Sequence, residues 1–172
     1  MIYDLGPDHG TLSVRTGRKG TVAKAGHDLL IHVTKWRGTL ALGDEPAVTL
    51  DADATSLKVR GGTGGMKALD DGDLANIEQT IDDDVLKRQD ISFRSTRVEE
   101  TADGLSVTGD LTLRGATRPI AFDLTVADER VRGEAVVKQT DWGMKPYTAL
   151  FGALKVADEV RVEIDVQLPQ SR

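Results

Sequence analysis

Apolar and polar residues alternate without interruption along two segments of the chain. In residues 105–114 the odd positions are apolar or glycine and the even positions are polar, and residues 160–168 show the same alternation up to Pro169. A period of two places successive side chains on opposite faces of a strand. Proline ends such a run because it lacks the backbone donor that continues the ladder. Both segments are therefore predicted to be β-strands with one buried face.

The same alternation recurs less completely along the rest of the chain. It predicts six further strands, at residues 11–16, 29–42, 48–59, 91–100, 118–126 and 131–139. Between Thr34 and Trp36 the apolar positions change from odd to even, which predicts a bulge or a sharp bend. Bends let strands curl, and closure removes exposed sheet edges. The sequence thus predicts an all-β fold, an antiparallel eight-stranded barrel.

One segment follows a helical period instead. Leu74, Ile77, Ile81 and Val85 recur at steps of three and four, which predicts one inserted amphipathic helix at about residues 73–86. The helix is expected either to close the barrel mouth as a lid or to pack simply against the core. Residues 70–86, which include this helix, contain seven acidic side chains and no basic one. A solvated helix face explains this acidity better than a docking surface does.

Length and composition narrow the class of protein. The 172 residues fit a single domain, residues 1–172, and the absence of cysteine excludes disulfides and thiolate chemistry. A net charge of −6 argues against nucleic acid as a partner. No apolar run approaches the ~20 residues that a transmembrane helix needs. The first seven residues do not resemble a signal peptide, so a cytoplasmic location is expected.

Motifs for catalysis and for metal binding are missing from the sequence. It contains no HExxH, no GxSxG elbow and no dinucleotide fingerprint, so we expect no enzyme and no cofactor. His27 and His32 are five residues apart, and an odd spacing on a strand places them on opposite faces. Folding is therefore expected to need no metal. His27 beside Asp28 either fixes a turn or anchors a ligand head group.

Three sequence blocks support a resemblance to a known family. Residues 110–120, DLTLRGATRPI, resemble the G-x-L-T-I-x-G-x-T-[RK]-P-V pattern of the YceI family, a group of lipocalin-like proteins. Residues 90–95, DISFRS, resemble the family's P-x-I-x-F-x-S strand, with Asp90 as a departure. Residues 141–144, DWGM, resemble its D-[FW]-G-[IM] element. The amino-terminal third, including residues 25–29, departs more from the family.

The resemblance implies a lipocalin-like barrel that binds and carries an apolar molecule without turnover. The implied ligand is a polyisoprenoid, a quinone-like molecule or a fatty acyl lipid. The alternating residues themselves predict an inward-facing apolar surface, which either lines a tunnel or fills the interior of the barrel. A stress-response or interaction protein with a filled barrel is therefore the second hypothesis. A homodimer is left open.

Candidate ligand-binding residues are the large apolar side chains expected to face the tunnel, together with His27. They are Trp36, Phe93, Leu111, Phe122, Leu124, Trp142, Met144, Tyr147 and Phe151. Residues 142–154 are rich in apolar side chains but lack a clean period, and Pro146 interrupts any ladder there. This segment is expected to fold over the barrel opening, either as a gate or as a plug.

Overall fold

The computed structural model describes residues 1–18, 28–63, 71–145, 148–149 and 154–172. In this part of the chain, strands dominate and one helical segment interrupts them. The strands are β1 (Ile2–Leu5), β2 (Gly10–Arg18), β3 (Asp28–Val33), β4 (Trp36–Ala41), β5 (Ala47–Ala52), β6 (Leu57–Thr63), β7 (Ile91–Glu100), β8 (Gly104–Leu113), β9 (Ala116–Ala127), β10 (Arg130–Lys138), β11 (Thr148–Ala149) and β12 (Leu154–Gln167). The helical segment is α1 (Asp71–Thr80) continued by the π-helical turn η3 (Ile81–Val85). Short 3-10 turns are η1 (Pro7–His9), η2 (Ala54–Ser56) and η4 (Gln139–Trp142).

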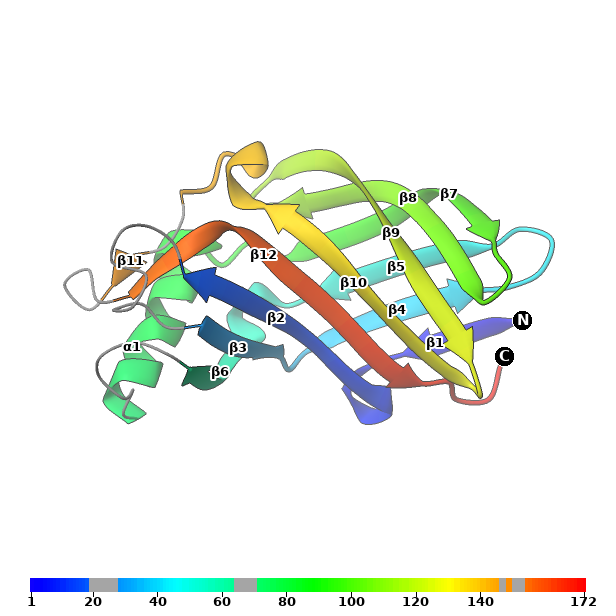
Figure 1. Cartoon of the computed structure of the whole chain (residues 1–172), viewed down its shortest axis with the longest axis horizontal. Coiled ribbons are helices and arrows are strands. Elements are labelled where there is room, and N and C mark those ends of the chain that lie inside the picture. Colours follow the sequence, from blue (N-terminus) through cyan, green and yellow to red (C-terminus); the bar gives the residue numbers. More distant parts are fainter. Residues whose placement is uncertain (19–27, 64–70, 146–147, 150–153) are drawn as a thin grey trace.

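The strands form one antiparallel sheet that curls on itself (Figure 1). Eleven of them pair in the order β1-β4-β5-β7-β8-β9-β10-β12-β2-β3-β6, and β11 pairs with β12. The path ends at β1 and β6. Each of these end strands is joined along the chain to a strand in the middle of the path, because β1 leads into β2 and β5 leads into β6. The all-β fold with one inserted helical segment is confirmed.

The predicted number of eight strands is wrong. The predicted segments 29–42 and 48–59 are each divided into two strands, and β1 and β11 were not predicted. The first division lies at Thr34 and Lys35, where the change of apolar phase predicted a bend, so that prediction is confirmed. The two bends support each other, since the Thr34 amide donates to the Ser56 carbonyl and the Asp53 amide donates to the Lys35 carbonyl, both at 2.9 Å.

Hairpin turns set the register of the later strands. Arg114 and Gly115 join β8 to β9, and Asp128 and Glu129 join β9 to β10, all with positive φ. Two successive positive φ values match the right-handed twist of the strands that they connect. In the register that results, the apolar positions of each strand share the inner face of the curled sheet.

The two chain termini lie at the end of the curled sheet that is opposite to α1 (Figure 1). The backbone amide of Arg172 donates to the carbonyl of Ile2 at 2.8 Å, and its guanidinium donates to Asp4 at 2.6 Å. These bonds hold the carboxyl-terminal tail against β1. None of the described helices is long and apolar enough to cross a membrane.

Candidate functional site

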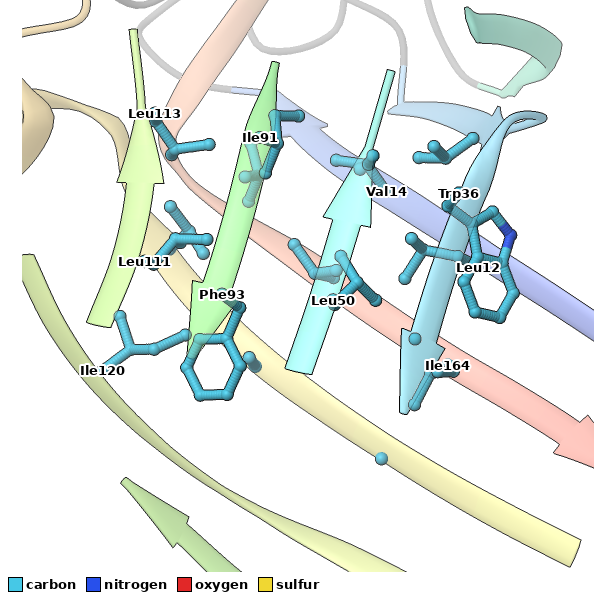
Figure 2. Close-up of a pocket in the computed structure, with 18 of the residues that line it drawn as sticks. Leu12, Val14, Trp36, Leu50, Ile91, Phe93, Leu111, Leu113, Ile120 and Ile164 are labelled. Atoms are coloured by element: carbon cyan, nitrogen blue, oxygen red, sulfur yellow. The ribbon is translucent and has the colours of Figure 1, made fainter. Parts of the chain in front are cut away.

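The inner face of the curled sheet surrounds an apolar cavity of about 240 Å³. Each of the eleven strands on the pairing path contributes lining residues, and so does η3. In Figure 2, side chains from opposite parts of the sheet, such as Leu12, Phe93 and Ile164, lie around the same space. The cavity is therefore the space that the alternating residues enclose.

The cavity occupies one part of the interior, while another part is filled. Near the termini, Leu40, Val107, Val131 and Val166 are each 1% exposed, as expected where side chains pack in contact with one another. Further toward α1, several inward-facing apolar side chains are only half-buried although they line the cavity. These are Val14, Leu50, Ile120, Phe122, Val162 and Ile164. The exposed part of each of these side chains faces the cavity.

An aromatic pair forms part of the wall. Phe93 of β7 and Phe122 of β9 lie with ring centroids 5.4 Å apart and ring planes at 55°, an arrangement typical of favourable aromatic contacts. Both rings extend over the β8 strand between them. Gly109 permits this, because a Cβ at that position would lie 2.5 Å from Cζ of Phe93. A side chain there would displace the ring.

The helical segment supplies the wall at the end of the cavity that is distant from the termini. Ile81, Val85 and Leu86 line it. The amide of Leu86 donates to the carbonyl of Ile81 at 2.9 Å, the bond of a π-helical turn. Because this turn contains more than four residues, Val85 and Leu86 lie on either side of Ile81 when viewed down the helix axis. All three side chains therefore lie on the same face of the helix. The buried stripe of the predicted helix is confirmed at Ile77 and Ile81, which are 0% and 6% exposed.

Two acidic side chains of this segment have roles beyond solvation. Glu78 accepts a hydrogen bond from the backbone amide of Val59 at 2.9 Å, which ties the helix to β6. Asp82 has a buried carboxylate oxygen without a hydrogen-bond partner in the described part of the chain. Burial raises the pKa of Asp82, and the charges of Arg88 and Lys58 oppose that shift.

We expect Asp82→Asn to raise the melting temperature at pH 7. A raised pKa means that, between the ordinary value of 3.8 and the folded-state value, the folded protein binds more protons than the unfolded chain. Ionisation of Asp82 therefore costs stability at neutral pH, and this cost disappears as the pH falls below 3.8. Thermal unfolding at pH 7 and pH 3.5 measures the difference in melting temperature between the wild type and Asp82→Asn. Asp84→Asn, at an exposed neighbouring residue, serves as the control. A lower melting temperature for Asp82→Asn at pH 7 would mean that attraction to Arg88 and Lys58 outweighs burial.

Two polar side chains at the wall, those of Thr16 and Gln139, are engaged in bonds of the fold itself, whereas the buried indole nitrogen of Trp36 has no hydrogen-bond partner in the described part of the chain. Thr16 accepts a hydrogen bond from the amide of Leu29 at 3.1 Å, and Gln139 donates to the carbonyl of Ala157 at 3.1 Å. Glu134 also borders the cavity, but it is exposed and its carboxylate lies 3.9 Å from the Arg161 guanidinium. No lysine or arginine is among the described lining residues.

The predicted ligand-binding residues fall into three groups. Six of them line the cavity, namely Trp36, Phe93, Leu111, Phe122, Leu124 and Met144. Trp142 is 5% exposed and is not among the described lining residues. His27, Tyr147 and Phe151 lie outside the described residues, as do residues 146–147 and 150–153 of the predicted gate or plug at residues 142–154.

Trp142 connects two of the sequence blocks that carried the resemblance. Its indole nitrogen donates to the carbonyl of Leu111 at 2.8 Å, and Arg118 donates to the carbonyl of Asp141 at 3.2 Å. The block at residues 110–120 is thereby fastened to the block at residues 141–144. Met144, two residues after Trp142, lies at the cavity wall, where its backbone amide donates a hydrogen bond to the carbonyl of Gln139 at 3.1 Å.

Several lining residues were not predicted from the sequence. Leu86 lines the cavity because of the π-helical turn, whereas α-helical spacing would turn it away from Ile81. Gly133 and Ala135 of β10 are half-buried and inward-facing, but their small side chains gave no signal. Their alternation with Val131 and Val137 could have identified them.

A fold and a cavity of this kind define a class of small barrel-like proteins that enclose apolar space. The YceI-like domain matches residues 3–168, so the chain belongs to the YceI-like family. Burkholderia cenocepacia BcnA has a similar structure, with a TM-score of 0.65 and 16% identity over 94% of this chain and 96% of that chain. The Campylobacter jejuni YCEI protein is also similar, with a TM-score of 0.57 and 13% identity over 81% of this chain and 84% of that chain. No curated protein sequence matches the chain.

Proposed function

We propose that this protein is a non-catalytic carrier that holds an apolar molecule in the cavity. The observation that carries the proposal is the set of half-buried, inward-facing apolar side chains around the empty space. In a filled barrel the same positions would be as buried as Leu40 or Val131, each 1% exposed. The hollow interior therefore favours a carrier over an interaction protein with a filled barrel.

Membership of the family supports the same proposal, because YceI-like proteins are known as polyisoprenoid-binding or lipid-binding proteins. A polyisoprenoid, a quinone-like molecule or a fatty acyl lipid supplies the apolar surface that this lining would cover. We propose that Trp36, Phe93, Leu111, Phe122, Leu124 and Met144 contact the ligand. Burial of each ligand methylene contributes about 0.8 kcal/mol to binding.

The lining also supports binding without turnover. General acid–base or nucleophilic catalysis needs a titratable or activated group within hydrogen-bond reach of the substrate. The described lining is mostly apolar, Thr16 and Gln139 are already bonded within the fold, and the carboxylate of Glu134 is exposed and lies 3.9 Å from the Arg161 guanidinium. Such a wall offers contact area and exclusion of water to its occupant.

Native mass spectrometry of freshly purified protein, followed by solvent extraction, tests the proposal. We expect an added mass that is extracted as an apolar compound, or, where the protein is isolated empty, binding of the fluorescent apolar dye N-phenyl-1-naphthylamine. A ligand that binds only the folded state stabilises it, by about 2.7 kcal/mol at a hundredfold excess over Kd. A bare mass from several expression hosts, with no dye binding and no shift in melting temperature, would refute the carrier and favour the filled-barrel interaction protein.

A further inference from the structure

The outer face of β2, β3 and β6 carries polar side chains that face away from the cavity. The three strands lie side by side (Figure 1), and their register places Ser13 of β2 opposite His32 of β3, which lies opposite Lys58 of β6. Leu12 and Ile31, which precede Ser13 and His32, are buried and line the cavity on the inner face. Because side chains alternate along a strand, Ser13 and His32 lie on the outer face.

Two exposed arginines flank His32. Arg15 follows Ser13 by two residues on β2 and therefore lies on the same face. Arg60 lies at a bulge of β6, where the pairing shifts by one residue and leaves Arg60 without a partner on β3. Burial and the positive charges of Arg60 and Arg15 lower the pKa of His32. Both guanidinium groups therefore lie within electrostatic range of the imidazole.

Acidic neighbours compensate only part of this positive charge. Glu163 of β12 lies opposite Ser13, and its carboxylate lies 2.9 Å from the guanidinium of Arg15. Lys58 is turned to account elsewhere, because its charge acts on the carboxylate of Asp82. Among the described residues, no carboxylate opposes the effect of the arginines on the pKa of His32. The electrostatic field at the imidazole is therefore positive.

Several donors around His32 are unused. In the part of the chain that the structure describes, the Ser13 hydroxyl, the His32 imidazole and the Arg60 guanidinium have no hydrogen-bond or ion-pair partner. Ser13 is only 6% exposed, so its longer neighbours cover most of it. An anion with several oxygen atoms can accept hydrogen bonds from these groups together, and arginine binds phosphate oxygens in pairs.

We propose that Ser13, Arg15, His32 and Arg60 form a binding site for a phosphate-type oxyanion on the outer face of the sheet. The site is separate from the cavity and goes beyond the carrier function. The arginines supply positive charge, and Ser13 and His32 supply hydrogen bonds. An anion bound here stabilises the imidazolium form of His32, so anion binding and protonation of His32 favour each other. The oxyanion is either a free phosphate ion or ester or the phosphate of a lipid head group.

NMR titration of the histidine ring protons tests the site on the intact protein. Sulfate serves as the probe, because its charge is constant near neutral pH, and His32→Gln assigns the signal. We expect saturating sulfate to raise the pKa of His32 by about one unit, the effect of an opposite charge at ~4–6 Å. The reference is sodium chloride at the same ionic strength, and His9 of η1 serves as the internal control. An equal rise in chloride would mean that salt merely screens the arginines, and it would overturn the site.

A matched pair of variants links the response to the site. Arg60→Gln removes an exposed guanidinium and should raise the dissociation constant of sulfate about tenfold, the cost of losing a hydrogen bond to a charged group. Arg97→Gln makes the same change in net charge on β7, which borders none of β2, β3 and β6, and should leave sulfate binding unchanged. Equal weakening by both variants would show that net charge alone attracts the anion, and it would overturn the site.

Vesicles of phosphatidylcholine and phosphatidylglycerol in equal parts distinguish the two sources of the oxyanion. Co-sedimentation of the wild type that is lost in Arg60→Gln but kept in Arg97→Gln assigns the phosphate of a lipid head group. A sulfate response without co-sedimentation assigns a free phosphate ion or ester. If the protein responds neither to sulfate nor to the vesicles, the site is wrong; the carrier function is unaffected, since dye binding in the cavity tests it separately.

Discussion

Trp142→Ala is expected to lower the free energy of unfolding by about 3–5 kcal/mol, the range observed when a buried aromatic side chain is truncated in a core. The indole is 5% exposed, and its nitrogen donates to the carbonyl of Leu111 at 2.8 Å. The substitution removes both the packing and this bond. Since small domains have only about 5–15 kcal/mol of stability in total, the loss is a large fraction of it. Urea unfolding monitored by circular dichroism measures the change.

Trp142→Phe separates the two contributions. The phenyl ring preserves much of the packing but leaves the Leu111 carbonyl without its indole partner, which costs about 1–3 kcal/mol. We expect an unfolding free energy between those of the wild type and Trp142→Ala. A loss below about 1 kcal/mol for Trp142→Ala would contradict the role of Trp142 in fastening η4 to β8, because a buried core aromatic costs more than that.

The strands of this protein were predictable where one face is buried along their whole length. The strict period of two in residues 105–114 identified β8 within one residue at each end, and residues 91–100 matched β7. The change of apolar phase at Thr34–Trp36 correctly predicted a bend, because a slip of one residue moves every side chain to the other face. Local patterning was sufficient at these positions.

The second bend had a comparable signal that was not recognised. Val48, Leu50 and Ala52 are inward at even positions, whereas Leu57 and Val59 are inward at odd positions. Between them, Asp53 accepts a hydrogen bond from the amide of Thr55 at 2.8 Å and caps η2. The four-residue strand β1 was too short to show a period, since only Tyr3 and Leu5 alternate inward.

The candidate site was predictable in kind but not in extent. Large apolar residues at inward positions, such as Phe93 and Leu111, were identified correctly as neighbours of one interior space. Whether that space is empty depends on the diameter of the curled sheet, which no local pattern encodes. The contribution of Leu86 depends on a π-helical turn, and the bond from Val59 to Glu78 depends on tertiary packing. These features needed the folded chain.

Leu40→Ala should lower the free energy of unfolding by about 2–5 kcal/mol, the cost of replacing a buried leucine with alanine. Leu40 is 1% exposed and lies between Tyr3 and Val48 of the neighbouring strands. Leu50→Ala on the adjacent strand makes the same chemical change at a half-buried residue that already faces the cavity. It should cost less than Leu40→Ala, because less packing is lost there.

The same pair of variants reports on the filled part of the interior near the termini. Leu40 borders the cavity, so its truncation should enlarge the apolar space by about the volume of the three carbon atoms removed, and an apolar alcohol such as 1-dodecanol should bind there. A bound alcohol would then fill the void and recover part of the lost stability, since binding to the folded state alone is stabilising. Urea unfolding with and without 1-dodecanol measures both effects. Equal losses for Leu40→Ala and Leu50→Ala would contradict the division of the interior into a packed end and a hollow end.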